Sequence, residues 1–189
     1  AIAVDAQGRA HIAGATCSRD FPVSSTAFQK DIGLITNIAF AAGLDADGKS
    51  LAYATYIGGS TSSGARSIAL APTGGIVISG WTYDWNFPST PDAPGRCNPD
   101  TTPAPNSRAM QGFAARLDAT GANLLYSSYF RAPASGATAV AIGAGTSRLL
   151  AAGRFEDTGA AVVEFDESVR ASEPTLTCVA NGANFLPNR

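Results

Sequence analysis

Short apolar runs separated by turn residues fill most of the chain. The first four runs comprise residues 2–6, 10–16, 38–44 and 51–57. A Gln-Gly pair at positions 7–8 separates the first two runs, and an Asp-Gly pair at positions 47–48 separates the last two. Runs of this length bounded by such turns predict β-strands joined as antiparallel hairpins.

The same pattern recurs along the chain. Residues 2–22 return, altered, as residues 68–88, and residues 44–56 return as residues 117–129. The two offsets, 66 and 73, differ by a seven-residue insertion within residues 89–107, which are rich in Pro, Asn, Asp and Thr, as surface loops are. A less regular third copy covers residues 140–165 and lacks the Phe-Pro pair of the other two. Such internal repetition is typical of repeat architectures.

A repeated unit of four short strands predicts a small antiparallel sheet of the kind found in propeller blades. Ile76-Val77-Ile78 shows no alternation, which suits strands that are packed on both faces. We therefore predict an all-β fold, a partial β-propeller of about three four-stranded antiparallel blades. The blades are expected at about residues 1–60, 66–131 and 137–178.

The first unit contains five motifs in order, Ile-Ala-Val-Asp-Ala-x-Gly, Gly-x-Thr, Asp-Phe-Pro, Leu-Asp-x-x-Gly and Tyr-x-x-Tyr-x-Gly-Gly, and the second unit repeats them with changes. Together they resemble the SBBP repeat, a bacterial β-propeller repeat, over roughly residues 1–165. The resemblance implies a secreted or cell-surface protein with no shared catalytic residues. Residues 179–189 resemble a linker or the start of a following Ig-like domain, so we expect a fragment of a larger secreted protein, cut at both ends.

Composition limits the partners and cofactors. The sequence pI is about 5.3 and basic residues are not clustered, which argues against a nucleic-acid partner. No apolar run approaches the ~18 residues of a membrane span. The single His and three Cys lack zinc-ligand spacing, and we expect no metal and no cofactor. Three blades leave apolar faces open, so the expected partners are neighbouring blades or other copies of the chain.

An aromatic cluster in the second unit is the strongest candidate ligand site. Its rings alternate along the sequence: Trp81, Tyr83, Trp85 and Phe87. An extended segment would place all four rings on one side, beside Asp84 and Asn86 as polar partners. The cluster indicates either a packing contact for the long loop or a stacking platform for a glycan or an aromatic peptide of an extracellular protein.

Other candidate residues favour structural roles. Asp45-Ala46-Asp47-Gly48 resembles the start of a calcium loop, but no Glu follows at the required distance. A tight turn, with Asp capping the backbone and Gly at positive φ, explains the motif better. His11 has no partner spacing for a triad, so we expect a structural role. Cys17 and Cys97 lie in equivalent loops and are a possible disulfide.

The sequence favours a non-catalytic protein. It contains no Gly-x-Ser-x-Gly motif and no phosphate-binding loop, and nothing in the spacing of its acidic residues selects a catalytic pair. The favoured function is a structural, adhesive or interaction module. The alternatives are a carbohydrate-binding module built on the aromatic cluster, or part of a polysaccharide-cleaving propeller.

Overall fold

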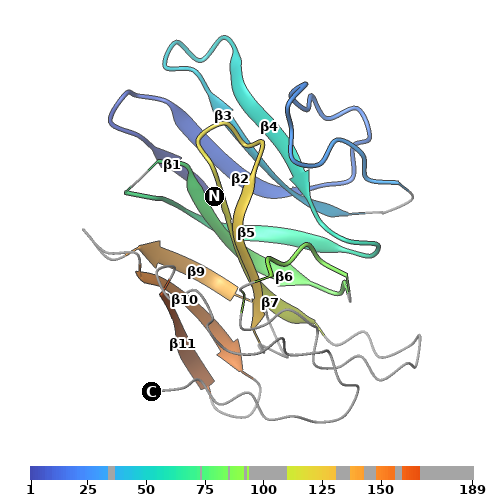
Figure 1. Cartoon of the computed structure of the whole chain (residues 1–189), viewed down its shortest axis with the longest axis vertical. Helices are drawn as coiled ribbons and strands as arrows, with labels where there is room; N and C mark the ends of the chain where they lie inside the picture. The colour runs from blue at the N-terminus through green and yellow to red at the C-terminus, as the bar shows by residue number, and fades with distance from the viewer. Residues whose placement is uncertain are drawn as a thin grey trace.

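The computed structural model describes residues 1–33, 37–72, 74–84, 86–91, 93, 110–130, 137–142, 148–155 and 159–166. Every regular element within these residues is a β-strand, which confirms the predicted all-β class. The strands form three antiparallel sheets that follow one another along the long axis of the molecule (Figure 1). The arrangement of such sheets in a propeller ring stays a prediction.

Each sheet is a meander in which neighbours in sequence are neighbours in space. Sheet 1 contains β1 (Ile2–Val4), β2 (Ala10–Thr16), β3 (Ile38–Leu44) and β4 (Leu51–Ile57). Sheet 2 contains β5 (Ser63–Leu70), β6 (Ile76–Thr82), β7 (Gln111–Leu117) and β8 (Leu124–Phe130). Sheet 3 contains β9 (Ala137–Ile142), β10 (Arg148–Phe155) and β11 (Gly159–Asp166). The end of the third expected blade, residues 167–178, and the expected C-terminal linker or start of an Ig-like domain, residues 179–189, lie outside the described residues.

The predicted turn chemistry is confirmed. Gly8, Gly48 and Gly121 have φ angles of 80°, 69° and 66°, a region that glycine adopts without steric cost. In the turn between β7 and β8, the Asp118 carboxylate accepts hydrogen bonds from the N–H groups of Thr120 and Ala122, both at 3.1 Å. These bonds satisfy backbone donors that no strand partner reaches, which fixes where the strands end.

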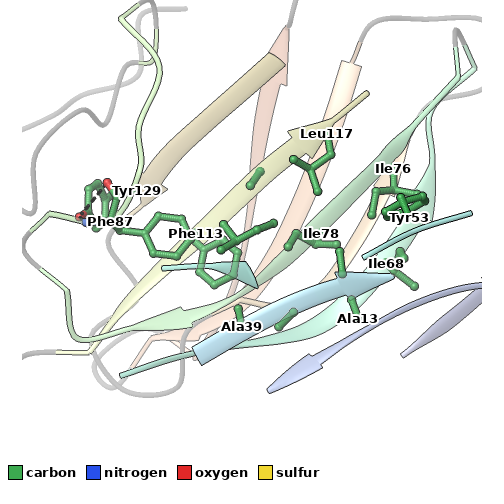
Figure 2. Packing of buried hydrophobic residues seen from close by; sticks show 14 residues of the cluster. Ala13, Ala39, Tyr53, Ile68, Ile76, Ile78, Phe87, Phe113, Leu117 and Tyr129 are labelled. Atoms are coloured by element: carbon green, nitrogen blue, oxygen red, sulfur yellow. Dashed lines mark hydrogen bonds between the residues drawn. The ribbon is translucent and has the colours of Figure 1, made fainter. Parts of the chain in front are cut away.

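The main core lies between sheets 1 and 2. Strand β5 lies against β1, β2 and β3, and side chains from both sheets form one buried cluster (Figure 2). Sheet 1 contributes small residues at the centre, Ala13, Ala39 and Ala41, and sheet 2 contributes larger ones, Ile68, Ile78 and Phe113. Small side chains on one face allow the larger ones of the other to approach closely. Strand β9 of sheet 3 in turn lies against β5 and β6.

Sheet 1 has two different faces. Tyr53 belongs to the cluster shared with sheet 2, whereas Tyr56 belongs to a separate cluster with Ile32 and Ile38. The two tyrosines are three residues apart, and residues at this spacing in a regular strand point to opposite faces. The second cluster lies under the loop between β2 and β3, which packs Phe21 against it. We call the face of sheet 1 that points away from sheet 2 its outer face.

The same loop covers the edge strand β4. The N–H of Ser24 donates to the carbonyl of Ala54 at 2.9 Å, and the N–H of Tyr56 donates to the carbonyl of Gln29 at 3.1 Å. The N–H of Ala54 donates to the Ser24 hydroxyl at 2.7 Å. An open strand edge is a template for pairing with another chain. These bonds occupy the edge of β4, so this edge is not open for pairing with a strand of a partner.

Candidate functional site

The carboxylate of Asp84 holds the segment that joins sheets 1 and 2, residues 58–62, which we call the linker. Asp84 is fully buried just beyond β6. The N–H of Gly59 donates to its Oδ2 at 3.0 Å, and both the N–H and the hydroxyl of Thr61 donate to its Oδ1. The Thr82 hydroxyl adds a fourth donor at 2.9 Å. Four donors on one buried carboxylate offset the cost of removing its charge from water.

Asn86 extends this contact to the next residue of the linker. Its Oδ1 accepts hydrogen bonds from the N–H of Ser60 at 3.0 Å and from the Ser60 hydroxyl at 2.9 Å. A Cβ on Gly59 would lie 2.4 Å from Asn86 Oδ1 and 2.8 Å from Asp84 Cγ, so only glycine fits there. The two residues that we expected beside a ligand thus bind the linker of their own chain.

The structure brings together two of the predicted platform residues. The rings of Trp81 and Tyr83 are half-buried and meet edge to face, with their centroids 5.6 Å apart. The Trp81 indole also covers Gly64 on the neighbouring strand β5, where a Cβ would lie 2.9 Å from the ring. Trp85 lies outside the described residues. Ligand binding by this aromatic pair stays a prediction.

The expectation that all four aromatic rings share one side is wrong. Strand β6 ends at Thr82, because the chain turns there to place the Asp84 carboxylate against the linker. Phe87 instead packs in the main core, with its ring centroid 4.3 Å from that of Phe113 and 6.0 Å from that of Tyr129 (Figure 2). The Tyr129 hydroxyl donates to the carbonyl of Asp84 at 3.1 Å and accepts the N–H of Phe87.

Unit one repeats this arrangement. The Phe21 ring packs on Phe40 and Tyr56, with centroid distances of 4.8 and 5.5 Å. The Tyr56 hydroxyl donates to the carbonyl of Ser18 at 2.8 Å. Ser18 is the repeat equivalent of Asp84. The phenylalanines of the two Phe-Pro pairs thus have the same packing role, and in both units the last tyrosine of Tyr-x-x-Tyr bonds the loop that carries them.

His11 belongs to a polar network in sheet 1, in line with the structural role expected for it. It is almost fully buried, with its Nε2 3.2 Å from Oδ2 of Asp5 and its Nδ1 3.0 Å from the hydroxyl of Tyr53. A carboxylate only accepts, so Nε2–H donates to Asp5, and in the neutral ring Nδ1 then accepts from Tyr53. Arg9 Nε donates to the same Asp5 oxygen at 2.7 Å.

The Asp5 carboxylate makes folding depend on pH. Burial acts to raise its pKa, but hydrogen bonds from the Arg9 backbone, His11 and the Arg9 side chain outweigh it and hold the pKa well below its usual value. A carboxylate with a lowered pKa stabilises the folded state above its unfolded pKa of about 4 and loses this effect as the pH falls.

We expect the Asp5→Asn variant to have a lower Tm at pH 7 and a weaker loss of Tm between pH 5 and pH 2. A thermal unfolding series across this pH range measures both. Some acid dependence should remain, since hydrogen bonds also lower the pKa of the Asp118 and Asp20 carboxyls. An acid slope equal to that of the unmodified chain would contradict the assignment.

The remaining sequence candidates are placed only in part. Cys17 is exposed directly after β2, and Cys97 lies outside the described residues, so their pairing stays a prediction. In the part of the chain that the structure describes, no group of three His, Cys, Asp or Glu side chains could hold a metal ion. The carboxylate of Asp47 instead accepts the N–H of Lys49 within its own turn, at 2.9 Å. Among the described residues, no helix is long and apolar enough to cross a membrane.

Sequence reasoning missed the linker residues as the partners of Asp84. The Thr-x-Asp sequence at positions 82–84 signals only the local bond from the Thr82 hydroxyl, and no local signal points to the linker residues. No protein-family model matches the chain, and no curated protein matches it. The likeness to the SBBP repeat therefore rests on its motifs and stays a prediction.

Proposed function

We propose that the chain is a non-catalytic β-propeller repeat segment, serving as a structural or adhesive interaction module of a secreted or cell-surface bacterial protein. One observation carries the proposal: the side chains that recur between the units build scaffold. Phe21 and Phe87 fill equivalent gaps, and Tyr56 and Tyr129 bond equivalent loops. A repeat whose recurring residues are used in packing provides a structural scaffold.

The apolar faces support an interaction role. Ile2 and Val4 on the outer face of sheet 1 are 66% and 60% exposed. Large apolar side chains grouped on one sheet face are typical of protein contact surfaces. The proposal therefore gives the chain neighbouring repeat sheets or an extracellular protein as partners.

A carbohydrate-binding module is the second candidate, and the Trp81–Tyr83 contact favours it. Two half-buried rings that meet at the end of a strand present edges and faces on which a sugar ring can stack. Asp84 and Asn86 are engaged by the linker, so this site would rely on the aromatic pair for its contacts.

Four measurements on the complete chain separate these functions. Light scattering and an apolar dye test for association and open apolar faces, both of which we expect. A glycan array tests the second candidate, for which binding must be lost in Trp81→Ala and kept in the control Leu125→Ala, an exposed residue of β8. Release of reducing sugar from a polysaccharide panel would contradict the non-catalytic proposal, and a monomer that binds no dye would contradict the interaction module.

A further inference from the structure

The outer face of sheet 1, which is open, corresponds in the repeat to the face of sheet 2 that packs on sheet 1. Ile2 and Val4 on β1 are the repeat equivalents of Ile68 and Leu70 on β5. In sheet 2 these positions pack on sheet 1, where Ile68 is 9% exposed and Leu70 lies against the shared core. In sheet 1 the same positions are largely exposed. The second unit thus shows what covers this face when a neighbour is present, namely the small-residue face of the preceding sheet.

Two polar residues beside the open face of sheet 1 correspond to the two residues of unit two that bind the linker. Ser18 and Asp20 are the repeat equivalents of Asp84 and Asn86. The N–H of Ser18 donates to the Thr16 hydroxyl at 3.1 Å, just as the N–H of Asp84 donates to that of Thr82. The Ser18 hydroxyl donates to the Asp20 carboxylate, and Asp20 is exposed.

We propose that the outer face of sheet 1 docks a further four-stranded sheet of the same repeat type, whose Gly-Gly-Ser linker is bound by Ser18 and Asp20. This inference deepens the proposed function and rests on it. Asp20 takes the place of Asn86, whose oxygen accepts two hydrogen bonds from Ser60. A carboxylate there accepts the same donors with charge assistance.

The shape of the outer face selects a repeat sheet as its occupant. Ile12 and Gly14 repeat Ile78 and Gly80 of sheet 2, so the large and small positions of the two faces correspond. A face of this shape fits an alanine-rich surface such as the one that sheet 1 presents to sheet 2. Pairing through the edge of β4 is not available, because the loop between β2 and β3 already bonds to it.

A second copy of the first two sheets does not supply this occupant. The alanine-rich face of sheet 1, with Ala39 and Ala41, is already covered by sheet 2. The linker of the same copy is held by Asp84 through the N–H groups of Gly59 and Thr61. The partner is therefore a repeat unit with a free alanine-rich face and a free Gly-Gly-Ser linker.

Duplication of the first unit tests the proposal. Residues 1–66 are fused directly before the complete chain, so that Ala1 of the original copy takes the place of Ser67, its repeat equivalent. The added copy carries Cys17→Ser, which makes its peptide around position 17 distinguishable by mass. In unit two, the N–H of Tyr83, the equivalent of Cys17, donates to the carbonyl of Ser62 at 2.9 Å.

Hydrogen exchange with mass spectrometry then reports docking. The original peptide containing Cys17 should exchange at least tenfold more slowly in the duplicated protein than in the unmodified chain. Val4→Glu in the original copy should remove this protection, while leaving the Tm of the unmodified chain unchanged. Leu125→Glu, also at an exposed site, should leave the protection in place. Asp20→Ala should reduce it.

Two results would overturn the proposal. In the first, the added unit is folded, as shown by protected amides in its own β3, but the original peptide containing Cys17 exchanges as fast as in the unmodified chain. In the second, the amides of the added unit stay unprotected. Docking would supply the interface that this unit needs to fold, so an unfolded added unit shows that it does not dock. The proposed function is tested by association, glycan binding and sugar release on the chain without the added unit, so failure of either idea is distinguishable from failure of the other.

Discussion

Replacing Asp84 with alanine is expected to lower the free energy of unfolding by about 3 kcal/mol. The substitution removes a buried carboxylate that accepts hydrogen bonds from Gly59, Thr61 and Thr82. It leaves the two linker N–H groups without their acceptor in a partly buried place, where an unmade hydrogen bond costs more than a made one contributes. Urea unfolding of the complete chain, followed by circular dichroism, measures the change.

Asp47→Ala is the matched control. Asp47 is exposed, and its carboxylate accepts the N–H of Lys49 in a surface turn, so its removal should change the free energy of unfolding by less than about 0.5 kcal/mol. Thr61→Val removes one hydroxyl donor from the Asp84 carboxylate and should cost about 1 kcal/mol. An Asp84→Ala variant no less stable than Asp47→Ala would show that the linker is held by other contacts.

The strands of the first unit follow closely from the sequence. The predicted runs at 10–16, 38–44 and 51–57 match β2, β3 and β4, because each is bounded by residues with strong turn preference. The first run was expected to reach residue 6, but β1 ends at Val4. Asp5 ends it, since its carboxylate accepts the N–H groups of Gln7 and Arg9 and closes the turn early.

The role of Asp84 was not predictable from its neighbours in sequence. Its donors Gly59 and Thr61 lie 25 and 23 residues away and reach it because β5, which follows the linker, pairs with β6, which precedes Asp84. The repeat gave no help, since the equivalent residue in unit one is Ser18. Local alternation suggested an aromatic platform with polar partners, whereas the fold used the polar side chains to attach one sheet to the next.

Contacts between sheets 1 and 2 occur at both ends of the shared core. At one end the Asp84 carboxylate binds the linker, and Phe87 packs nearby on Phe113 (Figure 2). At the other end Tyr53 of sheet 1 meets the turn of sheet 2 that contains Gly121. Attachment at two separated points fixes the angle between the sheets as well as their distance, which a single apolar patch would not do.

Replacing Tyr53 with alanine is expected to have the largest effect, a loss of about 4 kcal/mol in the free energy of unfolding. Tyr53 is 1% exposed and belongs to the cluster shared by the two sheets. A Cβ built on Gly43 would lie 2.5 Å from the Tyr53 ring, and one built on Gly121 would lie 2.4 Å from it. The ring therefore fills a slot between two glycines, and its removal leaves a cavity that neither can fill. Urea unfolding measures the loss.

Tyr53→Phe separates the ring from its hydroxyl. The phenylalanine keeps the packing between Gly43 and Gly121 and loses only the hydrogen bond to His11, so its cost should be about 1 kcal/mol. Leu51→Ala, at an exposed site on the same strand, serves as the control for β4 itself. If Tyr53→Ala costs no more than Leu51→Ala, the two sheets are not stabilised through this contact. If Tyr53→Phe costs as much as Tyr53→Ala, the stabilisation comes from the hydrogen bond to His11 within sheet 1, and not from the contact of the ring with sheet 2.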